Sequence, residues 1–174
     1  AIFTDIKNEN IIEAQQHISD ITDVYNSDGE IIHTGYPAID SIVNFKLQAA
    51  RKNVVKVNVS STLPQGLNIS SFDLTVVFGN LIDNALQAVS LVPENKFIDL
   101  ALHYSKGMML IKVSNPFINE IKKSGDKVIT TKKDKKNHGY GLTSVKEAVE
   151  KYDGTIDIIP ENNIFTVTVV LYVD

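Results

Sequence analysis

Hydrophobic residues recur at every third or fourth position in the middle of the chain, which predicts an amphipathic helix that starts after Ser70 or Ser71 and ends before Pro93. Its apolar stripe consists of Leu74, Val77, Phe78, Leu81, Ala85 and Ala88. A continuous polar stripe on another face consists of Asn80, Asp83, Asn84 and Gln87. Asparagine and aspartate have low helix propensity, so the polar stripe is either a face packed under a loop or a binding surface.

The same periodicities predict two more helices and five strands. Helical spacing covers residues 38–52, with Pro37 at the first turn, and residues 141–152. Gly154 is the expected carboxyl cap of the latter helix, and residues 106–107 mark a tight hairpin turn. Alternation with period two predicts strands at 54–60, 96–104, 108–114, 155–159 and 164–173. We therefore expect an α/β fold, a two-layer α/β sandwich whose mixed, mostly antiparallel sheet has helices on one face.

Two segments differ from this regular pattern. Residues 10–24 carry a narrow apolar seam with helical spacing, which is typical of helices that pair, and a turn follows at residues 26–30. Residues 115–138 have little hydrophobic periodicity and many lysines. Such long polar segments are usually functional lids or disordered loops. We expect residues 1–30 to be part of a helical hairpin and residues 33–174 to form the main domain, with a lid at about 115–138.

Composition narrows the class of function. The net charge of −4 and the pI near 5.5 argue against general nucleic-acid binding, which requires a basic surface. The chain has no cysteine, which excludes disulfides and thiolate metal sites. A metal ion in this protein would therefore have oxygen or nitrogen ligands.

The polar stripe and two later glycines suit a magnesium–phosphate site. Magnesium prefers oxygen ligands and keeps several waters, so the amide oxygen of Asn84 suffices as a protein ligand, with Asn80 one turn earlier beside the same ion or its water. Gly139 and Gly141 start the next predicted helix, where backbone N–H groups and the helix dipole favour phosphate. Taken alone, two such glycines are also compatible with an ordinary turn.

A basic run lies between these two motifs. Its lysines are Lys132, Lys133, Lys135 and Lys136. They would neutralise a triphosphate if the lid closes over it, and the alternative is a solvated charge run. The order of the motifs makes Lys132 and Lys133 candidates for phosphate binding.

Two strings in this order, NLIDNALQA and HGYGLTSVKEAVEKYDG, resemble the ATP-binding catalytic domain of sensor histidine kinases, within the GHKL or Bergerat superfamily that also contains DNA gyrase and MutL. TGYPAIDSIVNFKLQAARK and the short lysine-rich lid are similar to the peptide-sensing, quorum-type and citrate-type kinases. The resemblance covers residues 33–174 and implies ATP and Mg²⁺ as ligands, with Asn84 as the magnesium ligand. The nucleotide-binding residues that it implies are Asn84, Gln87, Asn115, Lys132, Lys133, His138, Gly139, Tyr140, Gly141 and Leu142.

Three positions depart from the family pattern. Asn115 stands where the superfamily has an aspartate that binds the adenine amino group, and Phe117 replaces the glycine that usually follows. Asparagine can still accept from that amine through its carbonyl oxygen, but without a charge. Asn80 stands where the ATP-hydrolysing members carry a glutamate base, which predicts low ATPase activity. Asp83 is the carboxylate on the same stripe and stays open as a base.

The resemblance implies a domain that transfers the γ-phosphate of ATP to a histidine. The acceptor normally lies on the first helix of a dimerising hairpin, whereas residues 8–21 fit the junction into the second helix, so we expect this chain to begin after the acceptor and not to phosphorylate itself. His17 is followed by Asp20 rather than by an adjacent acid. Implied partners are the phosphoacceptor helix and a response regulator.

The resemblance further implies the cytoplasmic domain of a membrane-anchored receptor, homodimeric at full length and a monomer or weak dimer as this fragment. One alternative is a degenerate GHKL-fold module that binds nucleotide or docks without kinase activity. An ATP-driven clamp or an anti-sigma-type kinase is another, but the clamp requires a catalytic glutamate, and the anti-sigma-type kinase lacks a dimerising helix.

Overall fold

The computed structural model describes residues 32–118, 122–124, 127–129 and 140–173. Five strands form one sheet in the order β1-β2-β3-β7-β6. They are β1 (Lys56–Thr62), β2 (Phe97–Ser105), β3 (Met108–Pro116), β6 (Thr155–Glu161) and β7 (Ile164–Tyr172). Within this sheet the β1–β2 pair is parallel and the other three pairs are antiparallel. The predicted mixed, mostly antiparallel sheet is confirmed.

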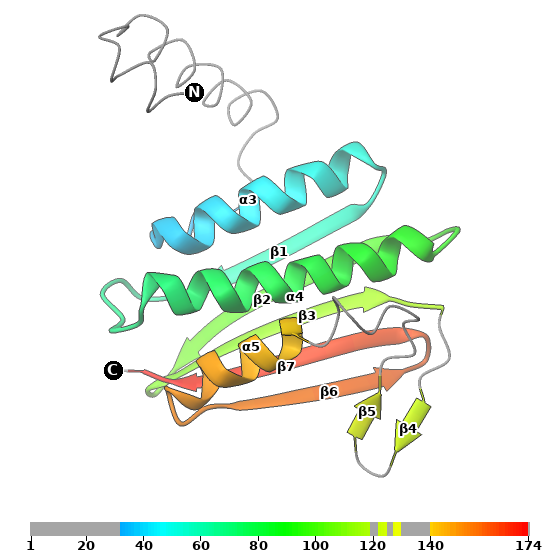
Figure 1. The fold of residues 1–174 in the computed structure, drawn as a ribbon. Helices are drawn as coiled ribbons and strands as arrows, with labels where there is room; N and C mark the ends of the chain where they lie inside the picture. The colour runs from blue at the N-terminus through cyan, green and yellow to red at the C-terminus, as the bar shows by residue number, and fades with distance from the viewer. Residues whose placement is uncertain (1–31, 119–121, 125–126, 130–139, 174) are drawn as a thin grey trace, which may run out of the picture. The chain divides into compact units, whose positions relative to one another are not determined.

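Three helices cover one face of the sheet (Figure 1). They are α3 (Pro37–Lys52), α4 (Ser71–Leu91) and α5 (Tyr140–Glu150). The predicted starts of α3 and α4 are confirmed, because Pro37 is the first residue of α3 and the Ser70 side chain caps α4 by accepting from the Asp73 N–H. The predicted two-layer sandwich with its helices on one face is therefore the observed architecture.

Alternation along the central strands builds the core between the two layers. The inward-facing residues are Ile98, Leu100 and Leu102 of β2, Met109, Ile111 and Val113 of β3, and Val167, Val169 and Leu171 of β7. From α4 the core receives Leu74, Val77, Phe78, Leu81, Ile82, Ala85 and Val89. By length and mean hydropathy, 1.3, α4 resembles a membrane-spanning helix. It is instead the middle helix of this layer, since it contacts α3, α5 and the sheet.

Some predicted boundaries were wrong. Strand β1 starts two residues later than predicted, because Val54 has a φ of 59° and belongs to the turn that ends α3. The predicted lid overlaps the last two residues of β3 and contains a short antiparallel pair, β4 (Lys122–Ser124) with β5 (Lys127–Ile129). The hairpin turn at residues 106–107 is confirmed by φ values of 50° and 79°.

Gly154 is part of the carboxyl-terminal cap of α5, as predicted. The left-handed residue is Asp153, with a φ of 49°. Gly154 follows it and donates its N–H to the Val149 carbonyl at 3.1 Å. A Cβ at Gly154 would lie 2.3 Å from the Val170 carbonyl oxygen and 2.8 Å from Val149 Cγ1. Glycine is required there because of close approach to β7.

Candidate functional site

The junction between α4 and α5 brings the two predicted motifs together. The start of α5 meets α4 at Asn80, and the residues that follow α5 meet α4 at Asp73, so the two helices run antiparallel. Figure 1 shows α5 beside the first half of α4. Between these ends α5 contributes Val145, Ala148 and Val149 to the core. The motifs are about sixty residues apart in sequence and adjacent in space.

The Asn80 amide is held in one orientation. Its Nδ2 donates to the Val76 carbonyl of its own helix at 2.7 Å. Its Oδ1 faces the start of α5, because a Cβ built on Gly141 would lie 3.1 Å from that oxygen. Gly141 therefore lets the first turn of α5 approach Asn80 closely. An amide oxygen cannot take a proton as a general base does, so this position offers a fixed hydrogen-bond acceptor only.

Among the other residues of the polar stripe, Asp83 has a partner on α3. Asn84 is half-buried one turn after Asn80, and Gln87 is exposed a further turn along α4. The Asp83 carboxylate instead forms an ion pair with Lys46 of α3, with Nζ 2.5 Å from Oδ1. The structure thus directs Asn80 toward α5 and Asp83 toward α3.

Asn115 lies on the inner face of the sheet near the end of β3 and is only 3% exposed. Its Nδ2 donates to the carbonyl of the next residue, Pro116, at 2.9 Å. Because this bond occupies the amide nitrogen, Oδ1 is the group that Asn115 can offer to a ligand. Phe117, which stands in place of the family's glycine, donates its N–H to the Asn163 carbonyl and packs edge-on against Phe165, with ring centroids 6.0 Å apart.

Two of the remaining predicted residues lie in the first turn of α5. Tyr140 is the first residue of this helix, and Leu142 is half-buried in its first turn. Predictions on Lys132, Lys133, His138 and Gly139, and on the helical hairpin at residues 1–30, fall outside the described residues.

A polar cluster at the opposite end of the α4–α5 pair escaped the sequence analysis. Asp73, 6% exposed, accepts from Lys151 Nζ at 2.6 Å through Oδ1 and from the Tyr152 hydroxyl at 2.9 Å through Oδ2. The Tyr152 oxygen in turn accepts from the Ser70 N–H at 2.9 Å. The spacing of Ser70 and Asp73 resembles a capping box and was the available sequence signal, but it gave no partner on another helix.

Lys151 and Tyr152 of this cluster keep their protons near neutral pH. The hydrogen bond to Asp73 raises the pKa of Lys151 above its usual value. Burial raises the pKa of the Tyr152 hydroxyl, and its bond to Asp73 acts in the same direction. Lys151 therefore stays charged and Tyr152 stays a neutral donor in this range.

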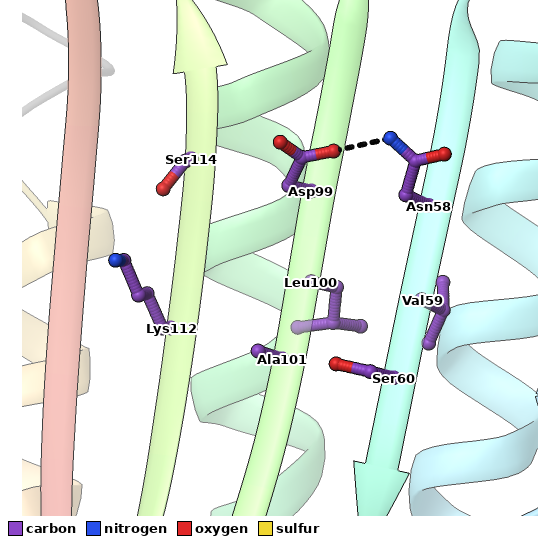
Figure 2. A pocket seen from close by; sticks show the side chains of 8 residues that line it. All are labelled: Asn58, Val59, Ser60, Asp99, Leu100, Ala101, Lys112 and Ser114. Atoms are coloured by element: carbon purple, nitrogen blue, oxygen red, sulfur yellow. Dashed lines mark hydrogen bonds between the residues drawn. The ribbon is translucent and has the colours of Figure 1, made fainter.

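The outer face of the sheet, opposite the helices, has a separate shallow basin of about 340 Å³ (Figure 2). It is lined by Asn58, Val59, Ser60, Asp99, Leu100, Ala101, Lys112 and Ser114. Asn58 Nδ2 donates to Asp99 Oδ1 at 2.6 Å. None of the predicted site residues lines this basin, so its side chains are suitable for control substitutions outside the candidate site.

Comparison with known proteins identifies the domain family. Residues 69–172 match the family model of the GHKL domain. The sensor histidine kinase DcuS of Escherichia coli (strain K12) is 36% identical over 115 residues, which cover 63% of this chain and 21% of DcuS. DcuS of Shigella flexneri matches equally well. The chain spans about a fifth of the length of the curated relatives it matches.

Solved structures with a similar fold include histidine kinases. The nucleotide-free catalytic domain of histidine kinase ThkA has a TM-score of 0.63 at 15% identity, over 80% of this chain and 92% of that domain. Acinetobacter baumannii histidine kinase AdeS has a TM-score of 0.53 at 15% identity, over 98% of this chain and 83% of AdeS. At these identities the similarity shows a common fold. The family-model match covers more than half of the chain, so the chain belongs to the GHKL family, and residues 69–172 form a GHKL domain with the fold of histidine kinase catalytic domains.

Proposed function

We propose that this chain carries the ATP-binding catalytic domain of a sensor histidine kinase, which binds magnesium-ATP at the α4–α5 junction and passes the γ-phosphate to a histidine. The contact between Asn80 and Gly141 carries this proposal. It places an oriented amide oxygen at the first turn of a helix that starts beside glycine, with a second asparagine one turn along α4. Membership of the GHKL family supports the same assignment.

The residues at this junction fit the parts of a magnesium nucleotide. Asn84 provides an uncharged oxygen ligand of the kind that magnesium accepts beside phosphate oxygens. We propose that backbone N–H groups at Gly139 and Gly141 bind the phosphates, because the amino terminus of a helix favours negative charge, and that Lys132 and Lys133 add positive charge. Bound magnesium supplies charge neutralisation to the phosphates during transfer.

Asn115 is the proposed reader of the base. Its buried Oδ1 can accept a hydrogen bond, and adenine has an amino donor at C6, where guanine has a carbonyl acceptor. The bond from Nδ2 to the Pro116 carbonyl prevents the amide from turning its nitrogen toward the ligand without losing a partner. We therefore expect ATP to bind more tightly than GTP.

The surroundings of the polar stripe favour phosphoryl transfer over hydrolysis. Asn80 cannot deprotonate water, and the Asp83 carboxylate is paired with Lys46 at 2.5 Å. We propose that neither residue activates water, so intrinsic ATPase activity is low and Asp83→Asn leaves it unchanged.

The finer assignments concern partners and location. His33 lies 3.8 Å from Asp40, and His103 contacts Thr62 at 2.7 Å on the outer part of the sheet. These two histidines are therefore occupied away from the α4–α5 junction, and we propose that a separate helix supplies the acceptor. We further propose a response regulator as the next recipient, a homodimeric full-length protein and a cytoplasmic position below a membrane sensor, which accords with the similarity to sensor histidine kinase DcuS.

Isothermal titration with a non-hydrolysable ATP analogue tests the proposal. We expect the chain to bind in the presence of magnesium, and EDTA or Asn84→Ala to weaken binding by about a hundredfold, because charged phosphates lose their metal bridge. Asn58→Ala is the matched control, since it removes the same amide from the outer basin and should leave affinity unchanged.

Two results would oppose the proposal. Absence of any binding by the wild-type chain would refute the nucleotide site. Equal affinities for the ATP and GTP analogues would remove Asn115 as the reader of the base.

A further inference from the structure

We infer that Asp73, Lys151 and Tyr152 form a clamp that positions the amino-terminal turn of α5 for nucleotide binding, an inference that rests on the proposed function. The three are positioning residues, because they lie at the opposite end of the α4–α5 pair from Asn80 and Gly141. They fix how α5 lies along α4, and thereby where its first turn lies.

The geometry of the clamp restrains both helices. Each oxygen of the Asp73 carboxylate has a different partner, with Lys151 Nζ 2.6 Å from Oδ1 and the Tyr152 hydroxyl 2.9 Å from Oδ2. Because the Tyr152 oxygen also accepts from the Ser70 N–H, one hydroxyl joins the end of α5 to both the cap and the first turn of α4. Two directed bonds to one buried carboxylate restrict rotation and sliding more than apolar contacts do.

Because α5 is short, the clamp at its carboxyl-terminal end also affects the position of its first turn, where we propose that nucleotide binds. α5 has only 11 residues, and its first turn approaches Asn80 so closely that an added Cβ would lie 3.1 Å from Oδ1. A small rotation or slide of this short rigid helix would change the distance between Gly141 and Asn80. Val145, Ala148 and Val149 pack the helix on the core, and the directed bonds of the clamp add a restraint on its axial position.

The clamp also differs from an ordinary surface ion pair. Asp73 is buried on the first turn of α4, where the helix dipole favours its negative charge. Lys151 is more than half exposed, so its ammonium can keep water while it holds the carboxylate. Burial of a carboxylate is costly unless it is paired and hydrogen-bonded, and here both oxygens are.

Three variants test the clamp at a temperature where all remain folded. Tyr152→Phe and Lys151→Met should each raise the dissociation constant for the magnesium–ATP analogue about three- to tenfold. Lys151→Arg keeps a charged donor to Asp73 and should retain wild-type affinity. Tyr36→Phe is the matched control, because the Tyr36 hydroxyl likewise donates one hydrogen bond and accepts another, and its partners, the Pro64 carbonyl and the Leu67 N–H, do not belong to α5. It should lower Tm without changing affinity.

Amide NMR without nucleotide gives an independent measurement. If the clamp positions α5, Tyr152→Phe shifts the Gly141 and Leu142 resonances, and Tyr36→Phe does not. Unchanged Gly141 resonances in Tyr152→Phe would overturn the inference, whether or not the wild-type chain binds nucleotide. If Tyr152→Phe and Tyr36→Phe lose the same amount of affinity for the magnesium–ATP analogue, the inference is also overturned, since the loss would then follow from reduced stability alone. Failure of the wild-type chain to bind would refute the proposed function, while the Gly141 shift still decides the clamp.

Discussion

Two glycines near the ends of α5, Gly154 and Gly141, have different kinds of neighbour. At Gly154, after the helix, an added Cβ would lie 2.3 Å from a backbone oxygen of β7, which cannot move without disturbing the sheet. At Gly141, in the first turn, an added Cβ would lie 3.1 Å from the side-chain oxygen of Asn80, which can give way. The first glycine is therefore required by the fold, and the second by the position of a functional side chain. Glycines with similar sequence signals can thus have separable roles.

The largest effect is expected from Gly154→Ala. The methyl group would overlap the Val170 carbonyl and the Val149 side chain, so the free energy of unfolding should fall by about 3 kcal/mol. Urea denaturation measures this change. Gly79→Ala is the control, because nothing lies within 4 Å of an added Cβ in α4. That substitution should raise the free energy of unfolding by about 0.5–1 kcal/mol. A Gly154→Ala variant as stable as the wild type would contradict the fold-based role.

A smaller effect, on binding, is expected from Gly141→Ala. The added methyl group should displace the Asn80 amide and weaken binding of the magnesium–ATP analogue about tenfold, or about 1.4 kcal/mol, with little loss of fold stability. Titration and urea denaturation of the same sample separate the two quantities. If the free energy of unfolding falls and affinity does not, the distinction between the two glycines is wrong.

The smallest effect is expected where a helix end lacks glycine. α3 ends as α5 does, with paired hydrogen bonds around a left-handed residue, and that residue is Val54, with a φ of 59° and 88% exposure. A β-branched residue is strained there, so Val54→Gly should raise the free energy of unfolding by about 1 kcal/mol in urea denaturation. Val54→Ala keeps most of the strain and is the control. Destabilisation by Val54→Gly would show that the exposed side chain makes a stabilising contact.

These helix ends also show which parts of the fold could be predicted from sequence patterns. Periodicity predicted α3, α4, α5 and the five strands of the main sheet, because apolar spacing follows directly from which face is buried. It misplaced the start of β1, because Val54 has high strand propensity and nothing local signals its left-handed conformation. It did not reveal the close approach of β7 to Gly154, because that approach depends on how β7 packs in the folded chain.

The site was predictable to a similar extent. Helical spacing placed Asn80 and Asn84 on one face, and the structure brings Gly141 of α5 close to Asn80. The nucleotide-binding roles of these residues stay predictions. The spacing did not separate Asp83 from Asn80, because the separation depends on Lys46 of α3. The clamp was missed for the same reason, since a buried Asp73 is meaningful only beside Lys151 and Tyr152.

Amide NMR mapping of the wild-type chain with magnesium and a non-hydrolysable ATP analogue is the most direct test of the nucleotide site at the α4–α5 junction. We expect the largest shifts, including side-chain amide shifts, at Asn80, Asn84, Asn115 and Gly141, on the helix-covered side of the sheet. Shifts concentrated at Asn58, Asp99 and Lys112 of the outer basin would contradict it, as would the absence of shifts at saturating nucleotide.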